Sequence, residues 1–283
     1  MLTRLKVHGF TLRGVSLGGI YTSIHVPELD ALFDVGWPVR SSATVRHLFL
    51  SHGHVDHAGG LASLLGMRAL FGYPAPLRVF LPGELAGPLS EMLSAMTRVQ
   101  RHSLAAELVP MQPGDEAALR GDLVVRAFRT HHPVPSLGFQ LVRRVSKLRA
   151  DLVGQGGREI AERRRRGEVV SESVDRLELA YATDTLAVAL DHEPSLYQSR
   201  VLVLECTFLD GKKSIADARA GCHIHLDELC ERADLFRNEA VVLMHFSQLY
   251  RPGEVREILA RRLPASLRER VSVFAPDTDD WPG

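Results

Sequence analysis

The segment formed by residues 48–60 constrains this chain more than any other part of its sequence. It places three histidines and one aspartate between His52 and His57, directly after the apolar run 45–50. The apolar run predicts a strand, and the glycines at 53, 59 and 60 predict a loop in which closely spaced side chains can turn toward one point. The chain must therefore fold so that this strand-to-loop junction is accommodated.

The clustered side chains predict a metal site. A single histidine among the 13 of this chain would most simply be a surface or core residue. Four candidate ligands in one short segment are different, because burying them together is unfavourable unless a cation binds. Imidazole and carboxylate groups without a thiolate suit zinc and similar divalent ions.

Composition indicates a folded protein without a strong electrostatic bias. The 283 residues are 45% hydrophobic, which suffices for one α/β domain spanning residues 1–283. Lys+Arg and Asp+Glu are balanced at 34 each, so any contact with nucleic acid must be local. Three cysteines without CxxC spacing argue against a disulfide framework, and no apolar stretch is long enough for a membrane span. We expect a cytoplasmic protein with no membrane association.

Short apolar runs alternate with amphipathic segments in both halves of the chain. Strands are expected within residues 2–49 and at 78–81, 123–128, 138–142, 178–182, 200–204, 240–244 and 271–275, and helices at 60–71, 84–98, 226–236 and 252–262. Strand clusters separated by helices predict two sheets packed face to face with helices outside, a four-layer αββα sandwich.

Further candidate ligands follow predicted strands elsewhere in the chain. His131 and His132 come after residues 123–128, Asp184 after 178–182, and His245 after 240–244. An aspartate in such a position is usually a cap or turn residue, and a histidine is usually an edge residue. Their joint occurrence after buried strands predicts that they complete the metal site.

These motifs together resemble a known family. The pattern His52-x-His54-x-Asp56-His57 resembles the signature of the metallo-β-lactamase superfamily. The stretches 18–24, 33–36, 132–139, 181–185, 204–210 and 245–250 resemble ribonuclease Z, the tRNA 3′-processing endonuclease, in the short form of plants and some bacteria. The resemblance covers most of the chain and implies the metallo-β-lactamase fold, hydrolysis of a phosphodiester and a homodimer.

The resemblance also implies a ligand set for two Zn²⁺ ions, for which Mn²⁺ or Fe²⁺ could substitute. One ion would be held by His52, His54 and His132, the other by Asp56, His57 and His245, with Asp184 bridging both. His132 is preferred over His131 because it stands six residues before Gly138, as in the family motif.

The same resemblance implies the reaction. A water shared by the two ions would attack the phosphorus, and Asp56 would orient it or accept its proton. His225 would donate a proton to the leaving oxygen, with Glu205 as the orienting carboxylate. His225 could instead cap the helix that begins near Leu226.

The chain departs from the family at several positions. Leu204, Thr183 and Leu249 replace the family's usual residues, and residues 143–176 suggest a short charged helix rather than the family's long tRNA-gripping arm. The run Arg163–Arg166 is either a solvated helix face or a phosphate-binding patch. Precursor tRNA and small or cyclic phosphodiesters are therefore both candidate substrates. The sequence also allows a thioester or lactone hydrolase on the same fold, or a non-enzymatic RNA-binding scaffold.

Overall fold

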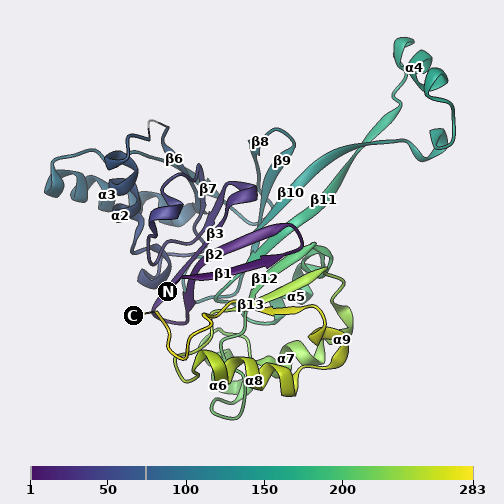
Figure 1. Ribbon diagram of the computed structural model, residues 1–283. Coiled ribbons are helices and arrows are strands. Elements are labelled where there is room, and N and C mark those ends of the chain that lie inside the picture. Colours follow the sequence, from purple (N-terminus) through teal and green to yellow (C-terminus); the bar gives the residue numbers. More distant parts are fainter. Residues whose placement is uncertain (1, 74, 283) are drawn as a thin grey trace.

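The computed structural model describes residues 2–73 and 75–282 and contains two seven-stranded mixed sheets packed against each other (Figure 1). The first sheet has the order β1-β2-β3-β4-β5-β6-β7, and the second has the order β14-β13-β12-β11-β10-β9-β8. Helices cover the outer face of each sheet, so the predicted four-layer αββα sandwich is confirmed.

The first sheet is antiparallel from β1 to β4 and parallel from β4 to β7. Its strands are β1 (Thr3–Val7), β2 (Phe10–Leu17), β3 (Tyr21–Val26), β4 (Ala31–Phe33), β5 (His47–Phe49), β6 (Leu77–Pro82) and β7 (Ala106–Met111). The parallel strands point their carboxyl ends in one direction, where loops can present polar side chains.

The second sheet mirrors this plan, with β8 to β11 antiparallel and β11 to β14 parallel. Its strands are β8 (Glu116–Arg120), β9 (Leu123–Arg129), β10 (Leu137–Leu148), β11 (Ser171–Ala182), β12 (Val201–Glu205), β13 (Ala240–Met244) and β14 (Val271–Val273). Strands β12 and β13 are buried along their whole length, which explains their continuous apolar sequences.

The helices lie mainly on the two outer faces, except α4, which lies outside the sandwich. They are α1 (Val55–Ala58), α2 (Leu61–Leu70), α3 (Ala86–Gln100), α4 (Gly157–Arg165), α5 (Val188–His192), α6 (Ile215–Ala220), α7 (Leu226–Glu231), α8 (Pro252–Arg262) and α9 (Ala265–Arg268). Short 3₁₀ segments are η1 (Pro27–Leu29), η2 (Arg40–Ser42), η3 (Gly83–Leu85), η4 (Ala150–Leu152), η5 (Pro194–Gln198) and η6 (Ala233–Leu235). Helices α2 and α3 pack on the first sheet, and α7 and α8 pack on the second.

Aromatic side chains connect the two sheets beneath the edge where β4, β5 and β11 end and β10 begins. Phe33 stacks on Tyr181 of the opposite sheet with ring centroids 4.7 Å apart, and Phe49 lies 5.4 Å from Phe139 across the same interface. All four side chains are fully buried. Each such pair contributes about 0.5–1.5 kcal/mol beyond the burial of its area. These contacts hold the two sheets in a fixed position beneath the loops.

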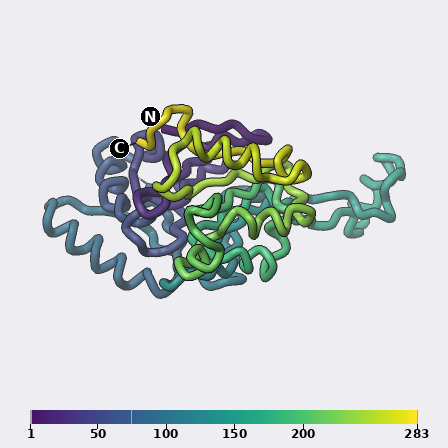
Figure 2. Tube along the Cα trace, turned by 90° about the horizontal axis from the view of Figure 1, so that it is seen from below, coloured from purple at the N-terminus to yellow at the C-terminus, as the bar shows by residue number. Residues whose placement is uncertain are grey.

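Strands β10 and β11 extend far beyond the sandwich as a hairpin arm that carries η4 and α4 (Figures 1 and 2). The prediction that residues 143–176 lack a long arm is wrong. The strands of the arm escaped the sequence analysis because both of their faces are solvated, so charges replace the alternation of apolar residues. Cross-strand ion pairs such as Arg144–Asp175 stabilise the pairing instead.

Other differences from the predicted elements are local. The expected helix 226–236 divides into α7 and η6, and the expected strand 45–50 is ordered as β5 over three residues only. Strands β7 and β8 were not predicted, because their residues are mostly half-buried or exposed. Within the described residues no helix is both long enough and apolar enough to cross a membrane.

Candidate metal centre

The histidine segment is fixed against the end of β4 by glycines. A Cβ atom on Gly36 would lie 1.8 Å from the carbonyl oxygen of Asp56, and one on Gly60 would lie 2.4 Å from that of Val35. The Val35 amide donates a 2.7 Å hydrogen bond to the His57 carbonyl. Only glycine permits this approach of the two backbones, which explains why the motif is rich in it.

Three histidines converge at one side of the site. His52 Nε2 lies 3.1 Å from His54 Nδ1, and His132 Nε2 lies 3.2 Å from the same atom. These rings come from the loop after β5 and from the loop between β9 and β10. With Asp184 they form one group whose ligand atoms all lie within 4.8 Å of one another.

A second group lies beside the first, and Asp184 of the first group contacts two of its members. Asp56, His57 and His245 have ligand atoms that also lie within 4.8 Å of one another. Asp184 Oδ1 lies 3.3 Å from His57 Nε2 and 3.2 Å from His245 Nε2, while its Oδ2 lies 3.7 Å from His52 Nε2. The structure thus brings the seven predicted ligands together, with one oxygen of Asp184 facing each group.

Two of these predicted ligands have strained backbones. Asp184 has a φ of 45° and His245 a φ of 59°, a region that non-glycine residues rarely adopt. Both residues lie just after buried parallel strands, and the left-handed turn directs their side chains into the site. Such strain is maintained only where the surrounding structure holds it and is typical of functional sites.

Asp34, which the sequence analysis did not identify, orients the histidines from behind. Its carboxylate is fully buried and accepts hydrogen bonds from His57 Nδ1 (2.8 Å), the Ser51 hydroxyl (2.8 Å) and the Tyr181 hydroxyl (2.6 Å). Because Ser51 donates to Asp34, its oxygen accepts from His52 Nδ1 at 3.0 Å. These bonds direct the Nε2 atoms of both rings into the site. Burial lowers the pKa of His57, but the charges of Asp184 and Asp34 raise it well above its usual value, so this ring releases a proton when a cation binds.

Glu205 and Thr207 do the same for His245. The Thr207 hydroxyl donates to Glu205 Oε2 and accepts from His245 Nδ1 at 3.1 Å. Glu205 also accepts from the Thr185 amide at 2.6 Å and from the Ile224 amide at 3.2 Å. The carboxylate is therefore fixed by several segments of the fold, and His245 is fixed through it.

The donor set fits divalent cations. Within the described part of the chain, the buried Nε2 atoms of His57 and His245 have no hydrogen-bond partner, although an unpaired buried nitrogen is costly. Desolvation, followed by the charge of His57, lowers the pKa of His52 to about 2, so its ring is a neutral ligand. Burial would raise the pKa of Asp184, but His245, His57 and His52 hold it well below its usual value.

The proton relay differs from its prediction. His225 is buried and its Nδ1 accepts from the Asp227 amide at 3.2 Å, so it caps α7 instead of facing the metal ligands. The hydrogen-bond partners of its ring are the Asp227 amide and the Asp210 carbonyl, and Glu205 is not among them. His223 takes that place: its Nδ1 lies 3.2 Å from Glu205 Oε2, and its ring lies 5.4 Å from that of His245.

The environment of His223 suits a proton donor. Burial lowers its pKa, but the charge of Glu205 and the hydrogen bond to it outweigh burial and raise the pKa to about 9. The sequence contained both histidines, separated only by Ile224, and no signal showed which of them faces the site. His131 points away, with its Nε2 lying 3.1 Å from His192 Nδ1.

Comparison with known proteins gives a consistent result at the level of sequence. Residues 26–246 match the beta-lactamase superfamily domain. The chain is 31% identical to tRNase Z TRZ1 of Arabidopsis thaliana over 269 residues, which cover 94% of this chain and 95% of that protein. It is also 31% identical to the chloroplastic tRNase Z TRZ2 of the same plant, over 91% of this chain and 73% of that protein.

Solved structures share the fold. The YhfI protein of Bacillus subtilis, described as a metallo-beta-lactamase fold protein, superposes with a TM-score of 0.58 at 14% identity, and the match covers 92% of each chain. The short form of human tRNase Z superposes with a TM-score of 0.55 at 18% identity, covering 83% of this chain and 92% of that one.

Proposed function

This chain belongs to the ribonuclease Z family of hydrolases within the beta-lactamase superfamily, and on that premise we propose that it cleaves precursor tRNA at the 3′ end. The observation that carries the proposal is the pair of ligand groups joined through Asp184. We propose that they hold two zinc ions, one at His52, His54 and His132 and the other at Asp56, His57 and His245. When bound, a pair of divalent ions supplies an activated water and stabilises the charge of a phosphodiester undergoing displacement.

Different side chains around that centre serve the two proton transfers, one from the attacking water and one to the leaving oxygen. Asp56 is half-buried, with its Oδ2 3.5 Å from His57 Nε2, and can orient the attacking water or accept its proton. His223 is held by Glu205 with its ring 5.4 Å from that of His245 and can donate a proton to the leaving 3′ oxygen. Glu205 positions both His223 and, through Thr207, His245.

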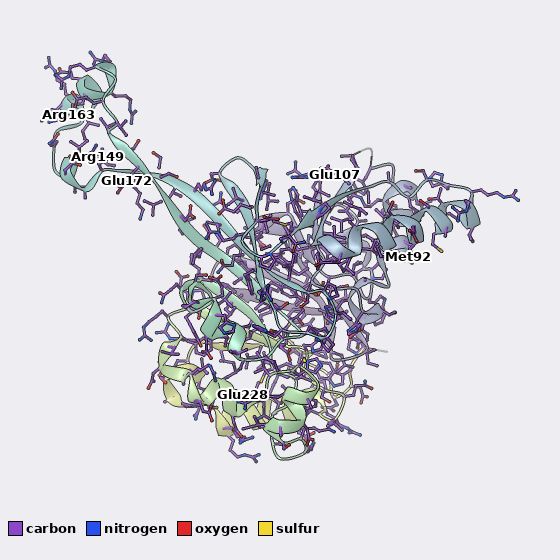
Figure 3. All side chains as sticks on the ribbon, turned by 180° about the vertical axis from the view of Figure 1, so that it is seen from behind. Met92, Glu107, Arg149, Arg163, Glu172 and Glu228 are labelled. Atoms are coloured by element: carbon purple, nitrogen blue, oxygen red, sulfur yellow. The ribbon has the colours of Figure 1, made fainter. Side chains whose placement is uncertain are left out.

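The hairpin arm is an argument for a large nucleic-acid substrate. Figure 3 shows Arg149 and Arg163 on the distal part of this arm, well away from the body that holds the metal centre. Several arginines of the arm are paired with carboxylates, as Arg158 is with Glu162. Arg164 and Arg165 are exposed at the end of α4 and offer charges to phosphates. The balanced net charge is thus compatible with local RNA binding.

A comparison of two substrates tests the proposal. The purified protein with zinc should cleave a precursor tRNA to a 3′-hydroxyl end far more efficiently than it hydrolyses bis(p-nitrophenyl) phosphate. Asp56→Ala serves as the blank for both reactions. Hydrolysis of the small diester alone would overturn the tRNA assignment, and faster consumption of a thioester would overturn phosphodiester chemistry altogether.

We also propose that the chain forms a homodimer. Met92, Met96 and Val99 are exposed at a spacing of one and two turns along α3, an apolar stripe that one helix face leaves uncovered. Sedimentation analysis should give the mass of two chains, and Met96→Glu should shift it toward one. A wild-type mass of one chain would refute this assembly.

A further inference from the structure

A cavity of about 360 Å³ opens directly beside the metal centre. His132, one of the proposed ligands, forms part of its wall. The remaining wall comes from the loop after β7, the start of η3 and the loop between β9 and β10, so both sheets contribute to it. Its volume lies at the lower end of the range of about 300–1,000 Å³ that small-ligand pockets occupy, which suits one nucleotide and excludes a duplex.

The wall of this cavity is rigid. Pro133 and Pro135 line it and fix the backbone on the distal side of His132. The Thr130 hydroxyl donates to that of Ser136 at 2.7 Å, and the Leu137 amide donates to the Ser51 carbonyl at 2.9 Å. The loop therefore holds the cavity and His132 in one fixed relationship, and a group bound in the cavity is placed at a set distance from the reacting phosphate.

The polar groups of the cavity match the parts of a nucleotide. Arg129 is exposed at the end of β9 and makes no ion pair among the residues that the structure describes, whereas Arg126 on the same strand is paired with Glu116. Gln112 also lines the cavity, and its Nε2 lies where a Cβ atom on Gly83 would be only 2.7 Å away. The Gln112 carboxamide therefore lies against the backbone at Gly83, where it can pair with a base edge.

We propose that this cavity seats the nucleotide adjoining the scissile phosphodiester, with Arg129 binding its phosphate and Gln112 its base. The proposal rests on the proposed function and adds a positioning site to it. A guanidinium is suited to bidentate phosphate binding, and a carboxamide offers both a donor and an acceptor to a base. The seated nucleotide is either the last one of the mature tRNA or the first one of the trailer.

Substitutions at the two residues test the site. Arg129→Gln and Gln112→Ala should each raise KM for precursor tRNA about fivefold or more, while kcat changes less than about twofold. Hydrolysis of bis(p-nitrophenyl) phosphate, which has no base and no second phosphate, should be unchanged. Arg261→Gln, which removes an exposed arginine from α8, is the matched control and should leave both reactions unchanged.

Abasic substrates identify the nucleotide. Removing the base on one side of the scissile bond should raise KM for the wild type, and Gln112→Ala should then cause no additional loss with that substrate only. The site is refuted if both variants cleave precursor tRNA like Arg261→Gln, or if they lose small-diester hydrolysis in equal measure, which would indicate damage to the metal centre. A wild type inactive on precursor tRNA would instead refute the proposed function itself, and the subsite with it.

Discussion

The Thr207 hydroxyl donates a 2.5 Å hydrogen bond to the Glu205 carboxylate, and this leaves its oxygen free to accept from His245 Nδ1. One hydroxyl therefore joins a proposed metal ligand to the carboxylate that holds His223. Loss of such an outer partner typically costs about 10–100-fold in metal affinity or activity. Thr207→Val should lower zinc affinity by that amount, measured by competition with a chelator.

The matched control is Thr207→Ser, which keeps the hydroxyl and should retain the wild-type affinity. Equal zinc affinity in Thr207→Val and the wild type would show that His245 does not need this partner.

His223 and His225 should have separable effects. His223→Ala should lower the rate of precursor tRNA cleavage about 10²–10⁴-fold, the usual contribution of a positioned acid. Its effect on bis(p-nitrophenyl) phosphate should be much smaller, because p-nitrophenolate leaves without a proton. His225→Asn should keep near-normal activity because asparagine can also cap α7. Single-turnover rates on both substrates check this, and a loss in His225→Asn as large as that in His223→Ala would contradict it.

The residues that the structure brings together could be predicted from the sequence because each is a histidine or aspartate close after an apolar strand. Asp34 follows β4 much as Asp184 follows β11. Nothing in the sequence shows that Asp34 binds the Nδ1 side of a histidine, whereas Asp184 faces the Nε2 side. The direction of His223 and His225 is set by the fold, because Ile224 between them is buried in the core and the two rings lie on different sides of it.

The hairpin arm was the part of the fold that was hardest to predict from the sequence. Along β10 the first six residues are buried and the rest are half-buried or exposed, because the strand leaves the sandwich midway. In the distal part, Lys147 pairs in register with Glu172, and Arg144 with Asp175. Backbone ladders and charge pairs hold these strands without a hydrophobic face, so the period of two carries no hydrophobic signal there.

Cys222 has a backbone conformation that suits glycine. Its φ is 58°, and it follows the end of α6 immediately before His223. A residue with a Cβ atom is disfavoured in this region, whereas glycine adopts it freely. Cys222→Gly should raise the free energy of unfolding by about 0.5–1 kcal/mol, measured by urea denaturation. Cys222→Ala keeps the unfavourable Cβ and should show no gain, so equal stability of the two variants would contradict the explanation.

His25 makes stability depend on pH in a region remote from the metal centre. Desolvation and then the charge of Arg13 lower its pKa to about 4, and the opposing effects of Asp30 and Glu28 are weaker. Below about pH 6.5 the unfolded chain binds a proton that the folded chain does not accept until about pH 4. Stability that is present above about pH 6.5 is therefore lost as the pH falls toward 4.

Replacement of His25 by leucine tests this pH dependence. Between about pH 7 and pH 5 the wild type should lose about 2 kcal/mol more of its unfolding free energy than His25→Leu does, and other titrating groups cancel in the comparison. His102→Leu, which removes an exposed histidine, should follow the wild-type profile. Parallel profiles for His25→Leu and the wild type would show that His25 is not the group responsible.

The arm should contribute to RNA binding through charge alone. Arg164 and Arg165 are exposed on α4, far from the ligand groups, so their replacement cannot disturb the chemistry directly (Figure 1). Each phosphate contact adds about 0.7–0.9 to the slope of log affinity against log salt. The double variant Arg164→Gln/Arg165→Gln should bind precursor tRNA more weakly, with a slope lower by about 1.4–1.8, while hydrolysis of bis(p-nitrophenyl) phosphate is unchanged. Arg4→Gln/Arg261→Gln removes two exposed arginines elsewhere and controls for net charge. An equal reduction of the slope in that control would mean that the whole surface, and not the arm, attracts the RNA.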